Sequence, residues 1–198
     1  MKNHITAVAA AVLAVSSFNV MAAQGDVIGG GNIQFNGTVN ADTCYVESTT
    51  GDAKTIVVPM GTVNTAQLQN STLATPAMPQ GVDQGGATFN ITCSAATGVE
   101  MKFAAASSQI ETGNKILKIN NGSNGPALAS GIGIAVYPDR TNTTAATAYD
   151  LTNGVLFSDT LTAGQKVQLQ FAAAYVKTAG PIKAGTANAT LPFTIITP

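Results

Sequence analysis

Short runs of alternating apolar and polar residues recur along this chain of 198 residues, and turn-forming residues separate them. Dipeptides such as Asn121-Gly122 and Asn153-Gly154 stand between the runs, and no window has an apolar stripe at helical spacing. A period of two is the spacing of a strand with one buried face. The sequence therefore predicts an all-β domain, with strands within residues 31–45, 55–59, 87–93, 99–105, 115–119, 131–137, 155–157, 166–177 and 187–197.

These runs follow one another without the intervening helices that a parallel sheet requires. Many short strands in one domain of this size are typical of a β-sandwich. Residues 61–86, which are rich in Thr, Gln and Pro, are expected to form the longest loop, with one helical turn at Thr65–Leu68.

Residues 1–22 have the features of a secretory signal peptide. Lys2 and His4 give a positive start, an apolar run follows at residues 5–15, and small residues precede Ala22. This apolar run is shorter than the roughly 20 residues that a membrane-spanning helix needs. We expect cleavage after Ala22, with Ala23 as the alternative, and export of the remaining chain.

The composition argues against several classes of function. His4 is the only histidine, so the exported chain lacks both a Ser-His-Asp triad and a zinc site with a His ligand. Nine basic and ten acidic residues nearly balance, which disfavours a nucleic-acid partner. Asp139, Asp150 and Asp159 lie beside turn residues, where Asp usually caps a loop. The sequence thus predicts neither an enzyme nor a bound metal or cofactor.

Cys44 and Cys93 are the only cysteines. An even, minimal count in an exported chain predicts one structural disulfide. Two thiolates without a histidine make an incomplete zinc site, and a redox-active pair usually has C-x-x-C spacing. The chain-entropy model gives a bridge over a loop of about 50 residues roughly 4 kcal/mol of stabilisation.

Glycine-rich sequence precedes the first cysteine, and Gly29, Gly31, Ile33, Phe35 and Gly37 alternate as on one face of a strand. A phosphate-cradling loop would need a helix directly after the glycines, whereas a strand pattern follows them. Two interpretations remain open on these residues alone. The stretch is either a flexible leader to the first strand or a segment that adds to the open sheet edge of another subunit.

The residues around both cysteines resemble those of a known family. The stretch from Gly31 to Cys44 reads GNIQFNGTVNADTC and is similar to the opening of chaperone–usher fimbrial subunits of the type 1 and P pilus kind. The strand end at Cys93, residues 131–137, residues 169–175 and the ending at 184–195 also resemble family strands, in the same order. By this resemblance the chain is a pilin of the major-subunit type.

The resemblance implies an immunoglobulin-like β-sandwich that lacks its last strand and keeps one disulfide. In such subunits a periplasmic chaperone fills the vacant position, and the N-terminal extension of the next subunit replaces it at an outer-membrane usher. The implied domains are a signal peptide at residues 1–22, a donor-strand extension at 23–37 and a pilin domain at 38–198. The implied donor residues are Gly29, Gly31, Ile33, Phe35 and Gly37, and the implied chaperone-contact residues are Phe193, Ile195 and Thr197.

One position departs from the family pattern. Such subunits usually carry a penultimate tyrosine in the strand that the chaperone holds, whereas Thr197 and Pro198 end this chain. The implied function is a homopolymeric structural subunit of a surface fimbria that supports cell adhesion. The alternatives are a minor adaptor, or an adhesin subunit that binds a host-surface glycan or protein.

Overall fold

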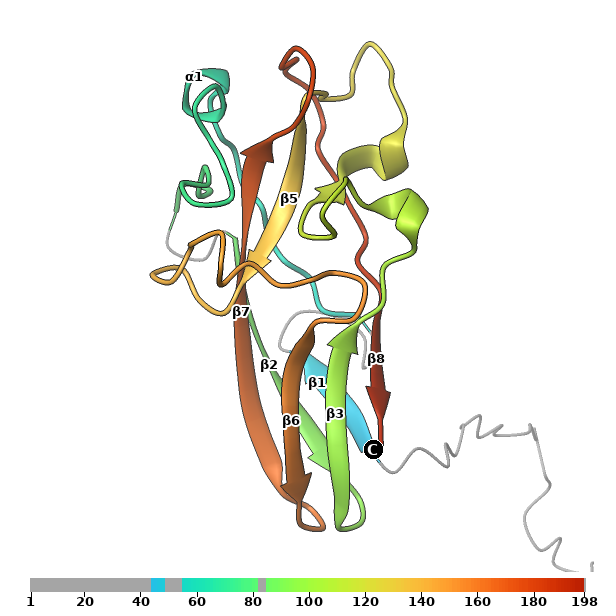
Figure 1. Cartoon of the computed structure of the whole chain (residues 1–198). Helices are drawn as coiled ribbons and strands as arrows, with labels where there is room; N and C mark the ends of the chain where they lie inside the picture. Colours follow the sequence, from blue (N-terminus) through green and yellow to red (C-terminus); the bar gives the residue numbers. More distant parts are fainter. Residues whose placement is uncertain (1–43, 49–54, 82–84, 198) are drawn as a thin grey trace, which may run out of the picture. The chain divides into compact units, whose positions relative to one another are not determined.

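The structure, a computed structural model, describes residues 44–48, 55–81 and 85–197. Its strands form two antiparallel sheets (Figure 1), one of five strands in the order β1-β2-β7-β5-β4 and one of three in the order β6-β3-β8. The elements are β1 (Cys44–Ser48), α1 (Thr65–Leu68), β2 (Gly86–Cys93), β3 (Thr97–Phe103), η1 (Ser107–Gln109), β4 (Leu117–Lys118), η2 (Ile119–Gly122), β5 (Ile132–Tyr137), β6 (Val155–Leu161), β7 (Lys166–Lys177) and β8 (Phe193–Ile196).

The all-β sandwich predicted from the sequence is confirmed. The expected helical turn is α1, and the expected strand over residues 166–177 is β7. Cys44 and Cys93 form the predicted disulfide, and their Cα atoms lie directly opposite each other in the β1–β2 ladder. The bridge therefore holds the edge strand β1 to β2, its only neighbour among the described strands.

Besides the expected strand at 115–119, of which β4 covers only Leu117–Lys118, two expected strands differ from the structure. Residues 55–59 form no strand, and only Phe193–Ile196 of the expected 187–197 strand is paired. Both stretches alternate between exposed and half-buried residues, as a strand does. A strand also needs a neighbour for its backbone hydrogen bonds, and the described part of the chain offers none to residues 55–58. The alternation was interpreted correctly, whereas the strand predicted over residues 55–59 and the first part of the strand predicted over 187–197 were wrong.

The core between the two sheets is a set of apolar side chains around the disulfide. We call it the disulfide cluster; its buried members are Val46, Phe89, Ile91, Cys93, Val99, Met101 and Leu161. They come from alternate positions of β1, β2 and β3, together with the last residue of β6. Because apolar residues alternate in the sequence, one apolar face of each sheet packs against the apolar face of the other sheet.

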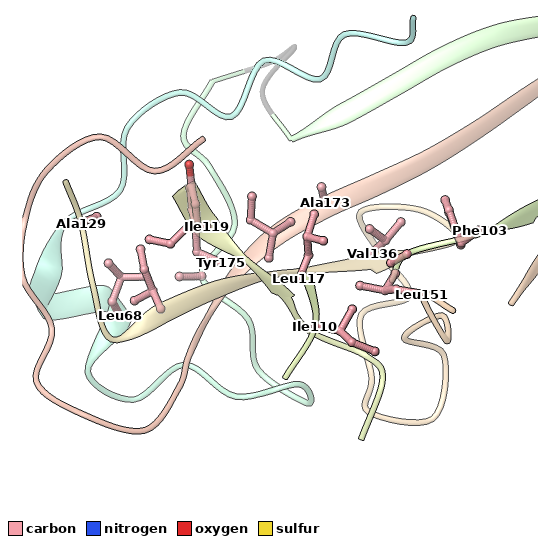
Figure 2. Packing of buried hydrophobic residues seen from close by; sticks show 14 residues of the cluster. Leu68, Phe103, Ile110, Leu117, Ile119, Ala129, Val136, Leu151, Ala173 and Tyr175 are labelled. Carbon is pink, nitrogen blue, oxygen red and sulfur yellow. The ribbon is translucent and has the colours of Figure 1, made fainter. Parts of the chain in front are cut away.

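A second, larger cluster extends under the loops that follow β3. It contains Leu68, Phe103, Ile110, Leu117, Ile119, Val136, Leu151 and Tyr175, among others (Figure 2). Phe171 packs against both clusters and makes edge-on ring contacts to Phe89 and Phe103, with centroid separations of 6.1 and 6.4 Å. Phe103 also contacts Tyr149 at 5.5 Å. A row of four aromatic rings therefore connects the two cores.

The outer face of β7 is exposed to solvent in the first half of the strand and buried in the second half. Lys166, Gln168 and Gln170 are exposed, whereas Ala174 and Val176 are buried in a third cluster with Leu73, Met78, Tyr137 and Ala148. The Tyr137 hydroxyl donates to the carbonyl of Leu73 at 3.0 Å, and burial raises the pKa of Tyr137 to about 12. Loops therefore cover the second half of this sheet face and leave the first half to solvent.

Thr92 on β2 has a buried hydroxyl without a hydrogen-bond partner in the described part of the chain. Such a group loses water without compensation, which costs about 1–3 kcal/mol. We expect Thr92→Val, which keeps the shape and β-branching, to raise the free energy of unfolding by about 1 kcal/mol. Urea unfolding would measure the change. Thr160→Val at an exposed position of β6 is the matched control; an equal gain there would contradict this explanation.

Candidate functional site

The sequence-predicted site residues fall in two parts of the chain. Residues 1–22 and the five donor positions between 29 and 37 lie outside the described residues. Phe193 and Ile195 lie half-buried on β8, and Thr197 follows this strand in an exposed position. The described part of the candidate site is therefore the C-terminal strand β8 and the residues that pack around it.

Residues 187–196 alternate strictly in exposure. Side chains at even numbers, from Asn188 to Ile196, are exposed. Side chains at odd numbers are half-buried against the core: Ala187, Ala189, Leu191, Phe193 and Ile195. Large apolar side chains in the interior are normally fully covered, as Phe89 and Ile91 are. This stretch thus presents an apolar face that the described chain covers incompletely.

β8 is an edge strand, and its free side has a defined set of backbone groups. Among the described residues, β8 pairs with β3 alone (Figure 1), and the N–H of Ala104 donates to the carbonyl of Pro192 at 2.9 Å. Hydrogen-bonded pairs alternate in an antiparallel ladder, so Thr194 and Ile196 bond to β3. The N–H and C=O groups of Phe193 and Ile195 then point away from β3. Within the described chain, no strand pairs with them.

Residues 55–63 form a second incompletely covered stretch. Ile56, Val58, Met60 and Val63 are half-buried, whereas Val57 between them is 48% exposed. Within the described residues, the one backbone hydrogen bond of residues 55–60 runs from the N–H of Gly85 to the carbonyl of Pro59, at 2.7 Å. The sequence pattern marked part of this stretch as a strand, but its relation to the C-terminal strand was missed.

The two stretches run in opposite directions over the same cores. Ile56 packs against the disulfide cluster, as do Phe193 and Ile195. Further along each stretch, the half-buried residues pack against the larger cluster: Val58, Met60 and Val63 from one, and Ala187, Ala189 and Leu191 from the other. We call these half-buried residues of the two stretches the half-covered strip. It is flanked by backbone without strand partners in the described chain.

Asn120 fixes the beginning of the 187–196 stretch. Its backbone N–H donates to the carbonyl of Asn188 at 2.6 Å, and its side-chain Nδ2 donates to the carbonyl of Thr186 at 2.8 Å. Asn120 has a φ of 53°, in the left-handed region that Asn tolerates better than most residues. The Tyr175 hydroxyl also donates to the carbonyl of Ala187, at 3.3 Å. The sequence marked only the following Asn121-Gly122 turn, because these partners are distant in the chain.

The chemistry of the half-covered strip is apolar. Residues 55–63 and 187–197 contain no charged side chain. A surface of apolar side chains beside free backbone groups suits the addition of an extended peptide.

Two of the three carboxylates considered in the sequence, Asp139 and Asp150, cap loops as expected, whereas Asp159 lies within the strand β6. Asp139 accepts hydrogen bonds from the side chain and backbone of Thr141, and these bonds lower the pKa of Asp139. Thr152 lowers the pKa of Asp150 in the same way. Within the described ranges, no three potential ligands among His, Cys, Asp and Glu are grouped as a metal site would require. No helix in those ranges is both long and apolar enough to cross a membrane.

Comparison with known proteins identifies the family. A family model described as "Fimbrial protein" matches residues 33–197. This chain belongs to the fimbrial protein family. No curated protein matched it in a sequence comparison.

The fold of this fimbrial protein is similar to that of solved pilus subunits. A subunit of a chaperone–usher pilus studied for rod uncoiling matches with a TM-score of 0.53 and 16% identity, over 86% of this chain and 97% of that one. The P pilus rod subunit PapA matches with a TM-score of 0.52 and 15% identity, over 79% of this chain and all of that one (100%). At these identities the likeness concerns the fold, and it agrees with the immunoglobulin-like sandwich expected from the sequence.

Proposed function

We propose that this fimbrial protein is the polymer-forming structural subunit of a surface fimbria, and that it assembles by donor-strand exchange. The observation that carries the proposal is the half-covered strip with the free edge of β8 beside it. In the described chain, two stretches with strand patterning have no strand between them, and the sequence carries an alternating segment at residues 29–37. Residues 29–37 of a second copy would therefore add a strand beside the half-covered strip of the first copy.

The exchange would use the residues expected from the sequence. Gly29, Gly31, Ile33, Phe35 and Gly37 would form the inward face of the donor strand. Burial of Ile33 and Phe35 would contribute about 1.5–3 kcal/mol each. The backbone groups of Phe193 and Ile195 would accept and donate the ladder hydrogen bonds. Because all these contacts are lost together, dissociation would be slow.

Delivery would follow the route of chaperone–usher systems. The signal peptide at residues 1–22 would direct export to the periplasm, where a chaperone would hold the C-terminal strand through Phe193, Ile195 and Thr197. An outer-membrane usher would then exchange chaperone for subunit and release the fibre at the cell surface. The absence of a tyrosine at position 197 favours a chaperone with a divergent contact at this end. The two similar structures come from pilus rods, which supports a shaft subunit over a tip adhesin.

The proposal is tested on fibres collected from the cell surface. Unboiled wild-type material should give a ladder of multimers on a gel, and a variant with Gly31→Asn and Phe35→Asp should give monomer alone. A buried aspartate without a partner is strongly unfavourable, and a side chain at Gly31 needs space. The matched control is Asn36→Asp, which places the same charge on the opposite face of the segment and should keep the ladder. A normal ladder from the double variant would refute donor-strand exchange through residues 29–37.

A further inference from the structure

The strands β1, β2 and the first half of β7 are neighbours in the five-stranded sheet, and polar side chains cover their outer face. Alternate residues of these strands, such as Val46 and Ile91, lie in the disulfide cluster on the inner face. We call the six residues on the other face the polar face. The register arranges them in two rows across the strands: Tyr45, Thr92 and Lys166 in one, and Glu47, Asn90 and Gln168 in the next.

Thr92 is the buried member of the polar face. It is 8% exposed, and its hydroxyl has no hydrogen-bond partner in the described part of the chain. Tyr45 and Lys166 lie on either side of it in the register, and their side-chain ends interact electrostatically. The two side chains therefore reach toward each other across Thr92. A ligand that supplies the missing hydrogen bond would gain from a hydroxyl that is now unsatisfied.

The residues around Thr92 offer both an aromatic ring and hydrogen-bonding groups to the solvent. Tyr45 is 43% exposed, so much of its ring is accessible. Asn90 is half-buried and Gln168 is exposed, and each side-chain amide can donate and accept hydrogen bonds. A tyrosine ring supplies a rigid apolar surface with a polar end, which suits a ligand that is itself partly apolar and partly polar.

The charges of the polar face cancel. Glu47 and Lys166 form an ion pair, and the other four residues carry no charge. A sulfated or sialylated partner, or a basic one, would find no unpaired countercharge here. Neutral sugars fit this balance, because their hydroxyls donate and accept hydrogen bonds and their C–H groups can pack on a ring. Strands about 4.8 Å apart and rows about 6.8 Å apart give room for a sugar ring lying flat.

We propose that the polar face is a binding site for a neutral saccharide. The sugar ring packs on Tyr45, and one sugar hydroxyl enters between Tyr45 and Lys166 to bond with the Thr92 hydroxyl. Asn90 and Gln168 bind neighbouring sugar hydroxyls. The inference goes beyond the proposed structural function, because it gives a shaft subunit a ligand of its own. Each subunit of a fibre repeats the face, so contacts that are weak singly add along the fibre.

The test measures the binding of fibres collected from the cell surface to polymer-linked neutral sugars: glucose, galactose, mannose, fucose, N-acetylglucosamine and N-acetylgalactosamine. Wild-type fibres should bind at least one of these conjugates. Thr92→Val should weaken that binding at least about fivefold, because the valine cannot form the hydrogen bond. The same substitution is expected to stabilise the fold, so unfolding cannot explain the loss. Thr160→Val, at an exposed position of β6, is the matched control and should bind as the wild type does.

Two substitutions of Tyr45 test the aromatic contact. Tyr45→Ala removes the ring and should weaken binding at least about tenfold. Tyr45→Phe keeps the ring and should retain most of the binding. Equal losses for both variants would contradict packing of the sugar on the ring.

The multimer ladder of the same fibres reports assembly separately. Loss of sugar binding by Thr92→Val and Tyr45→Ala with a normal ladder supports the site. The site is wrong if wild-type fibres bind none of the six conjugates, if they bind only sialylated or sulfated ones, or if Thr92→Val binds as the wild type does. If both variants lose the ladder, the polar face instead contacts another copy of the chain.

Discussion

Replacement of both Cys44 and Cys93 by alanine is expected to lower the free energy of unfolding by about 4 kcal/mol. The bridge closes a loop with a sequence separation of 49 and joins β1 to β2, its only neighbour among the described strands. Without it, the unfolded chain gains conformational freedom and β1 keeps only its ladder with β2. Urea unfolding followed by circular dichroism would measure the loss. Replacing both residues avoids a free thiol.

Tyr45→Ala serves as the control for this prediction. Tyr45 lies on the same strand, next to Cys44, and its side chain is 43% exposed. Its removal should cost much less than the loss of the disulfide. If the doubly substituted protein unfolds at the same urea concentration as the wild type, β1 does not depend on the bridge and our interpretation is wrong.

The second large effect is expected for Phe103→Ala, which should lower the free energy of unfolding by about 3–5 kcal/mol. Phe103 is 3% exposed and has edge-on contacts to both Phe171 and Tyr149. Its removal leaves a cavity in the larger cluster and breaks the row of rings that connects this cluster with the disulfide cluster. Thermal and urea unfolding would both report the loss.

Two further variants make this prediction specific. Phe157→Ala removes the same atoms from a half-buried position of β6 outside the row of four rings, and should cost clearly less. Phe103→Leu keeps most of the volume and should recover a large part of the stability. Equal losses for Phe103→Ala and Phe157→Ala would contradict a connecting role for the aromatic row.

Local patterns in the sequence were sufficient for much of the fold. Alternation over residues 166–177 predicted β7 at its observed bounds, because both its neighbours and its buried face lie within the same chain. The two cysteines predicted their bridge because no other partner was available. These patterns could not predict the order of the strands within the sheets. For example, β5 and β6 follow each other in sequence but belong to different sheets. Pairing depends on contacts between distant residues, which alternation alone does not encode.

The candidate site was predicted in part for the same reason. The alternation at Phe193 and Ile195 correctly indicated one apolar face, and Thr197 lies exposed beyond it. Residues 55–59 had equal strand character but form no strand, since none lies beside them in the described chain. The role of this stretch was missed, although the alternation continues through Met60. Asn120 gave no signal, because its hydrogen-bond partners Thr186 and Asn188 are more than sixty residues away.

The position of the disulfide also determines how this domain bears mechanical load. A pull from the N-terminal side reaches Cys44 and passes through the S–S bond directly to Cys93, so the β1–β2 ladder carries little of the force. The chain between the two cysteines, a sequence separation of 49, stays out of the extending chain. At about 3.5 Å per residue, about 170 Å of contour length is held back when the domain is stretched. A domain unfolded by force therefore releases a shorter length of chain than it would without the disulfide, and it refolds from a shorter extension.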